Sequence, residues 1–165
     1  MLAAIAWVWV VGISGPTAAA EKCHFSTYVV DKDPKGLNVR AEPNSKSSVI
    51  AVLPNDSDGT IVDIRGSEGS WLQIVKAETI EGKQVFQGKG WVFAELVGTS
   101  TRYEGTDHAL HAQASLKSPI VGKIPGEKEV TLRGCSGTWP KVKWKSIEGY
   151  LSPDQHCPNP VTTCP

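Results

Sequence analysis

The chain has a single methionine among 165 residues and few long apolar runs. Beyond position 20, no window of eleven or more residues keeps apolar side chains at the i, i+3, i+4 and i+7 spacing of a helix. A helical bundle is therefore not expected. Neither sign of charge is in excess, because 17 Lys and Arg balance 17 Asp and Glu. This balance argues against a nucleic-acid partner, which needs a basic stripe to neutralise phosphates.

Motifs of catalysis are also missing. The sequence contains no G-x-S-x-G, H-E-x-x-H or glycine-rich phosphate loop, and its cysteines form no C-x-x-C pair. His108 and His111 lie three apart on a predicted strand, so their side chains point to opposite faces. Paired carboxylates occur only on polar turns, where solvated turn chemistry accounts for them: Asp31 with Asp33, and Asp56 with Asp58. We predict no enzyme, no metal site and no cofactor.

The first twenty residues contain no charged side chain. Their apolar stretch, Leu2–Ile13, is too short to span a bilayer, which needs about 20 residues. Gly15-Pro16 and the small residues Ala18–Ala20 follow it, as before a signal-peptide cleavage site. Residues 1–20 are therefore predicted to be a signal peptide, and the protein to be periplasmic or secreted. It would contact a membrane only through this segment, if uncleaved.

After residue 20, predicted strands of four to six residues alternate with clusters of Gly, Asn, Asp, Ser and Pro: Leu37–Arg40, Val49–Leu53, Thr60–Ile64, Trp71–Val75 and Gly90–Phe93. This pattern is typical of a small β-barrel or sandwich. Between the last two strands, residues 76–89 are predicted to form a protruding hairpin. Phe86 in this hairpin is expected either to cover a groove between Trp71 and Trp91 or to contact a partner.

The second half of the chain repeats this layout. Several pairs of segments align: Leu110–Ala114 with Leu37–Ala41 at an offset of 73 residues, Ile124-Pro125 with Leu53-Pro54 at 71, Trp139 with Trp71 at 68, and Gly149 with Gly90 at 59. The offset changes only where turns lie, and its largest change falls within the predicted hairpin. The repeat predicts two domains, residues 21–100 and 101–165.

The first half carries a more specific pattern, in the segments Gly36–Pro43, Val49-Ile50, Leu53-Pro54, Trp71–Ile74 and Gly90–Val92. It closely resembles the bacterial SH3 domain, whose pattern reads Leu-Asn-Val-Arg, a Val-Ile pair, a Trp that opens a strand, and a closing Gly-Trp-Val. The second half keeps Trp139 and Gly149-Tyr150-Leu151 but has lost the Leu-Asn-Val-Arg motif. The resemblance implies an all-β fold of two small SH3-like β-barrels in tandem, the second divergent.

The resemblance also implies a function. It points to an exported, monomeric, non-catalytic module that binds cell-wall (peptidoglycan) peptides or other extended peptides of the bacterial envelope. The alternatives are an envelope protein–protein interaction module, or a small inhibitor or stress factor without affinity for the wall. The candidate ligand-binding residues are Asn38, Arg40, Glu42, Trp71, Phe86 and Trp91.

The same residues have structural alternatives. Asn38 and Arg40 share one face of their strand. Asn38 is expected either to hold the adjacent turn or to contact ligand, and Arg40 either to pair with Glu42 or a loop carboxylate or to contact ligand. Trp71 and Trp91 are expected either to line a peptide groove or to plug the ends of the barrel.

All four cysteines follow the predicted signal peptide, so two disulfides are expected in an oxidising compartment. An up-down-up meander in the second half favours a Cys135–Cys157 bond, which leaves Cys23 to pair with Cys164. The alternative joins Cys157 to Cys164 and Cys23 to Cys135.

Overall fold

The computed structural model describes residues 20–55, 59–103, 105–159, 161 and 164. Nearly all of the predicted signal peptide lies outside the described residues, as do Asp56 and Asp58. The described part is all-β, with thirteen strands and one short 3-10 helix, η1. In this part, no helix is long and apolar enough to cross a membrane.

The strands expected in the first half are all present, and three of them are longer than predicted. The elements are β1 (Glu21–Val29), β2 (Leu37–Arg40), β3 (Val49–Leu53), β4 (Thr60–Glu68), β5 (Trp71–Thr79), β6 (Gln84–Phe93), η1 (Ala94–Leu96), β7 (Val97–Thr101), β8 (Asp107–His111), β9 (Ile120–Pro125), β10 (Glu129–Ser136), β11 (Trp139–Trp144), β12 (Ile147–Leu151) and β13 (His156–Cys157).

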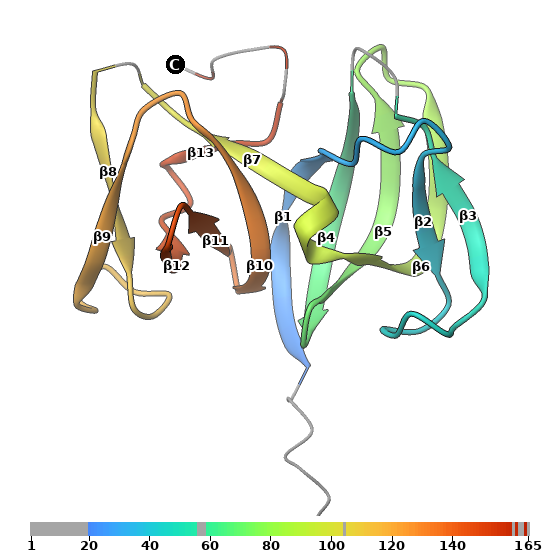
Figure 1. The fold of residues 1–165 in the computed structure, drawn as a ribbon, viewed down its shortest axis with the longest axis horizontal. Helices are drawn as coiled ribbons and strands as arrows, with labels where there is room; N and C mark the ends of the chain where they lie inside the picture. Colours follow the sequence, from blue (N-terminus) through green and yellow to red (C-terminus); the bar gives the residue numbers. More distant parts are fainter. Residues whose placement is uncertain (1–19, 56–58, 104, 160, 162–163, 165) are drawn as a thin grey trace, which may run out of the picture.

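All strands belong to one sheet, in the order β3-β2-β6-β5-β4-β1-β7-β10-β11-β12-β8-β9, with β13 paired to β7. Read outward from the central β1–β7 pair, the two halves have the same order, because each strand of β1–β6 has its counterpart six strands later in the chain. We call β1–β6 the first lobe and β7–β12 the second lobe. Figure 1 shows the first lobe on the right and the second on the left.

Each lobe has an apolar cluster produced by the alternation of side chains along its strands. In β2, Leu37 and Val39 are buried while Asn38 and Arg40 face the other way, as predicted. The buried cluster of the first lobe includes Leu53, Val62, Ile64, Leu72, Ile74 and Val92. That of the second lobe consists of Leu110, Ile124, Val130, Val142 and Leu151.

Corresponding loops in the two lobes have the same hydrogen bonds at a constant offset of 71 residues. Loop 41–48 joins β2 to β3, and loop 112–119 joins β8 to β9. The matching bonds are Ala41 N to Ser48 O (3.0 Å) with Ala112 N to Pro119 O (2.8 Å), and Glu42 N to Ser47 Oγ (2.9 Å) with Gln113 N to Ser118 Oγ (2.8 Å). The predicted offset of 73 is therefore wrong by two residues, and His108, not Leu110, corresponds to Leu37.

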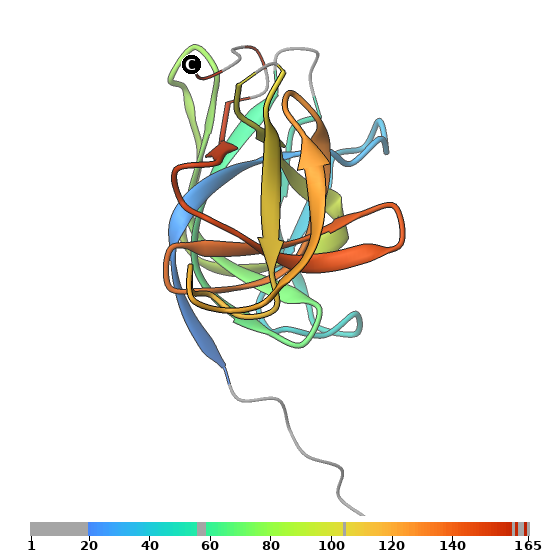
Figure 2. The ribbon, with the colours of Figure 1, turned by 90° about the vertical axis from the view of Figure 1, so that its left-hand side faces the viewer.

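The first strand explains the disulfides. β1 was not predicted; it continues beyond the first lobe, and Figure 2 shows it as one long, curved strand. His24 N donates to Gly137 O, and Gly137 N to Lys22 O, both at 2.8 Å. This contact places Cys23 against the hairpin of β10 and β11, and Cys23 is bonded to Cys135.

The favoured disulfide pairing is therefore wrong, and the alternative is present: Cys23–Cys135 and Cys157–Cys164. Ser100, on β7, pairs with Cys157 of β13 and also with Glu129, which lies at the start of β10. Cys135 lies six residues further along β10, about 20 Å away at 3.3 Å per residue. The meander argument failed because β13 pairs with β7 at the opposite end of β10 from Cys135.

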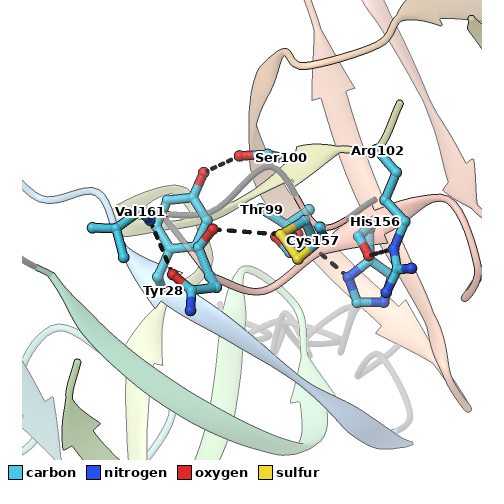
Figure 3. The surroundings of a disulfide bond; sticks show 9 residues. Tyr28, Thr99, Ser100, Arg102, His156, Cys157 and Val161 are labelled. Atoms are coloured by element: carbon cyan, nitrogen blue, oxygen red, sulfur yellow. Dashed lines mark hydrogen bonds between the residues drawn. A yellow bond between two sulfur atoms is a disulfide. The ribbon is translucent and has the colours of Figure 1, made fainter. Parts of the chain in front are cut away.

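Side chains at the junction of the lobes are buried and hydrogen-bonded. The hydroxyls of Tyr28 and Ser100 lie 2.7 Å apart, and Thr99 Oγ1 donates to Cys157 O at 2.7 Å (Figure 3). Burial raises the pKa of Tyr28 to about 12. Burial, with the nearby Arg102 cation, lowers the pKa of His156 to about 4. Both groups are therefore neutral at physiological pH.

Candidate functional site

The first lobe has a pocket of about 350 Å³ beside the outer face of β2 and the start of β5. Its lining comes from loop 30–36, β2, loop 41–48, β5, β6 and η1: Asp31, Asp33, Gly36, Leu37, Asn38, Arg40, Ser45, Trp71, Phe93 and Leu96. We call it the Trp71 pocket. It brings together Asn38, Arg40 and Trp71, three of the six residues predicted to bind ligand.

Aromatic rings form one wall of the Trp71 pocket. Trp71 opens β5 and is paired in register with Phe93 at the end of β6. Their rings meet edge to face, with centroids 5.6 Å apart. Leu72 and Val92, their neighbours in sequence, are fully buried on the opposite face. Trp71 therefore lies on the outside of the lobe and does not plug an end.

Arg40 lies at the end of β2, on the same face as Asn38. Its Nη1 donates to the backbone oxygen of Ser47 at 2.6 Å, which ties the guanidinium to loop 41–48. The predicted pairing with Glu42 is not observed, and Glu42 lines a different groove. Arg40 lines the Trp71 pocket, and its guanidinium has further N–H groups besides the one bonded to Ser47.

Two aspartates of the pocket were interpreted from the sequence as ordinary turn residues. Asp31 Oδ1 accepts the N–H of Asp33 at 3.0 Å, and Asp33 Oδ1 accepts the N–H of Lys35 at 2.9 Å. The turn ends at Gly36, whose φ of 88° favours glycine. Turn chemistry is therefore present, but the fold also places both carboxylates in the pocket, which no local sequence signal indicates.

The remaining predicted site residues lie elsewhere. Glu42 and Trp91 line a second, more open groove of about 680 Å³ together with Ala41, Pro43, Asn44, Glu68 and Lys89. Trp91 is 6% exposed and pairs with Arg40 across the β2–β6 contact. A Cβ on Gly90 would lie 2.3 Å from Val39 Cγ1, so glycine allows the two strands to approach. Trp71 and Trp91 thus do not share one groove.

Phe86 is half-buried in the hairpin and lines neither the Trp71 pocket nor the second groove. The predicted hairpin over 76–89 is confirmed by the pairing of β5 with β6. Phe86 pairs with Ala77 in this hairpin and packs against the buried cluster of the first lobe. Because Trp71 and Trp91 line different cavities, Phe86 is not a lid over a shared groove, while its role as a partner contact stays a prediction.

The second lobe arranges the corresponding positions differently. His111, the counterpart of Arg40, points its Nδ1 at Ser118 O, 3.2 Å away. Its ring also meets the edge of Trp139, the counterpart of Trp71, with centroids 5.7 Å apart. Residues that flank an open pocket in the first lobe are thus in contact with each other in the second. His108 instead faces Arg102 O, so the two histidines do not converge.

The fold and site are those of a small all-β module with a lined surface pocket. Residues 35–98 match the family model described as the bacterial SH3 domain. No curated protein matches the chain. Two solved structures from Trichomonas vaginalis are similar at 14% identity: NlpC2, covering 81% of this chain with a TM-score of 0.33, and NlpC1, covering 89% with a TM-score of 0.32. The chain spans 48% and 50% of their respective lengths.

Proposed function

We propose that the protein is an exported, monomeric binding module that recognises cell-wall peptides, or other extended peptides of the bacterial envelope, in the Trp71 pocket. One observation carries this proposal: eight of the ten residues that line the pocket, all but Asp31 and Asp33, lie within the segment that matches the bacterial SH3 domain. An aromatic wall beside polar groups is the usual composition of a peptide-binding groove. The match and the two disulfides suggest an extracellular or envelope location.

The proposal includes the absence of catalysis. All four cysteines are bonded in disulfides, so none supplies a thiolate. Three histidines are buried and face backbone carbonyl or threonine oxygens of the protein itself: His108, His111 and His156. The titratable carboxylates of the Trp71 pocket, Asp31 and Asp33, accept backbone N–H groups. These contacts support binding rather than general-base chemistry.

We also propose that the second lobe is a divergent copy of the first, so that the protein is a tandem pair of SH3-like barrels. The repeated strand order and the matching loops support a duplication. In this proposal β7 is the counterpart of β1, so the second copy would begin at Val97, four residues before the predicted boundary at residue 101. In this proposal the second copy contributes to the fold but does not bind ligand at its Trp139 position.

Retention on purified peptidoglycan sacculi tests the function. The purified protein should sediment with sacculi, and Trp71→Ala should abolish sedimentation. Trp139→Ala is the matched control, since it removes the corresponding ring of the second lobe; it should still sediment. Circular dichroism of each variant verifies folding. Wild-type protein that stays in the supernatant, like a charge-matched control protein, contradicts the proposal.

A second candidate is an envelope protein as the partner. It is favoured by β3, an edge strand of the sheet that exposes Val49 (46%), Ile50 (49%) and Val52 (49%). Edge strands can accept an added strand from another chain. Co-purification from envelope extracts that survives Trp71→Ala but is lost in Ile50→Lys identifies this mode.

A further inference from the structure

The Trp71 pocket carries charges of both signs that lack ionic partners. Within the described part of the chain, the ion pairs join other side chains: Asp63–Arg65, Lys76–Glu78, Glu95–Arg133 and Lys141–Glu148. Arg40 is held by a backbone oxygen, and Asp31 and Asp33 accept only backbone N–H groups in their turn. The pocket therefore has one cation and two carboxylates available to an occupant.

These charges lie toward opposite ends of β2. Asp33 belongs to the turn that closes on Gly36 through the Gly36 N to Asp33 O bond of 2.9 Å, directly before the strand. Arg40 is the last residue of the strand. Four residues of strand separate Gly36 from Arg40, about 13 Å at 3.3 Å per residue. Lys32 and Lys35, which alternate with the aspartates in sequence, do not line the pocket.

The rest of the lining combines the polar residues Asn38 and Ser45 with apolar and aromatic side chains. Trp71 and Phe93 form its wall, with Leu96 from η1 beside them. An extended peptide advances about 3.3–3.6 Å per residue, so three or four residues cover the separation of the charges. The volume of about 350 Å³ lies at the small end of the range for ligand sites, which is about 300–1,000 Å³, and suits such a short segment.

We propose that the Trp71 pocket selects short peptides with both ends free. The ammonium group binds Asp31 and Asp33, the carboxylate binds Arg40, and small apolar side chains lie against Trp71. This inference rests on the proposed function in its wider form, the binding of extended envelope peptides, and names their class: a zwitterionic peptide of three or four residues, not an internal segment of a longer chain. The peptide would lie alongside β2.

Capping the peptide ends tests the inference. Trialanine, N-acetyl-trialanine and trialanine amide are titrated into the full chain, with tryptophan fluorescence and calorimetry as readouts. We expect each cap to weaken binding by about tenfold, the effect of losing one charge-assisted contact at a partly exposed site.

Variants then assign each end of the peptide. In D31N/D33N, the acetyl cap should no longer weaken binding, while the amide cap still should. In R40Q, the reverse is expected. Asn can still accept the N–H groups of the turn, so the double variant retains its loop. Asp107→Asn and Lys143→Gln, on β8 and β11 of the second lobe, are matched controls in which both caps should keep their effect.

The outcomes separate this inference from the proposed function. Equal binding of the three peptides by the wild-type chain overturns the inference. The inference is also overturned if the protein fails to bind trialanine but is still retained on sacculi in a manner that depends on Trp71. In that case the proposed function stands. Binding that depends on free peptide ends, with no retention on sacculi, supports the inference and rejects the wall as the target.

Discussion

Cys23 and Cys135 lie 112 residues apart in the chain, yet their Cα atoms are 6.0 Å apart and a disulfide joins them. This bond ties β1, the first strand of the first lobe, to β10 of the second. The other bond, Cys157–Cys164, closes a loop of only seven residues. In the chain-entropy description the long loop stabilises the fold by about 5 kcal/mol and the short one by about 2 kcal/mol.

We therefore expect Cys23→Ser/Cys135→Ser to lower the free energy of unfolding by more than twice as much as Cys157→Ser/Cys164→Ser. Urea denaturation measures both. Non-reducing tryptic mapping should link fragment 23–32 to fragment 134–141 and leave fragment 146–165 bridged within itself. A link between fragments 134–141 and 146–165 contradicts the structure.

The hairpin of β5 and β6 gives a second prediction. Because Phe86 packs on the core of the first lobe, Phe86→Ala should lower the free energy of unfolding by about 2 kcal/mol, less than for a fully buried ring. Gln87→Ala, at the exposed neighbouring position, should change it by less than about 0.5 kcal/mol. Equal stability of the two variants would show that the hairpin is a dispensable projection.

The buried His156 predicts acid sensitivity. Its pKa is lowered to about 4 in the folded protein, whereas the unfolded chain has the ordinary value of 6.5. Between these values the unfolded state binds the additional proton, so stability falls as the pH falls from about 6.5 to about 4. The loss is about 3 kcal/mol, at about 1.4 kcal/mol per pKa unit.

This loss can be measured by urea denaturation between pH 4 and pH 7.5. His156→Gln should remove most of the pH dependence over that range. His24→Gln, at an exposed position of β1, should leave it unchanged. A wild-type protein that is equally stable at pH 4.5 and pH 7 is incompatible with a neutral, buried His156.

The contact between His111 and Trp139 predicts that His111 stabilises the fold and does not bind ligand. His111→Ala removes the ring contact and the bond to Ser118 O, so it should lower the free energy of unfolding by about 1–2 kcal/mol. Retention on sacculi should stay at the wild-type level, in contrast to Arg40→Gln at the corresponding position of the first lobe. A loss of retention in folded His111→Ala would assign binding to the second lobe.

Local patterns were sufficient for five of the six strands of the first half, all but β1. The alternation in Leu37–Arg40, the turn residues around it and the strand that begins at Trp71 depend on neighbouring residues only, and all are found as predicted. The orientation of Arg40 away from the core follows from the same period of two. Its partner did not follow, because Glu42 is only two residues away and Ser47 seven, and only the shape of the loop selects the backbone oxygen of Ser47.

The sequence by itself therefore determined the all-β class, the inward and outward faces of β2 and the segment that matches the bacterial SH3 domain. The tertiary structure alone decided which aspartates share a pocket with Trp71, and which cysteines are bonded. These relationships join residues far apart in the chain, such as Cys23 on β1 and Gly137 in the β10–β11 turn. Periodicity specifies the face that a side chain occupies, but not which distant strand lies beside it.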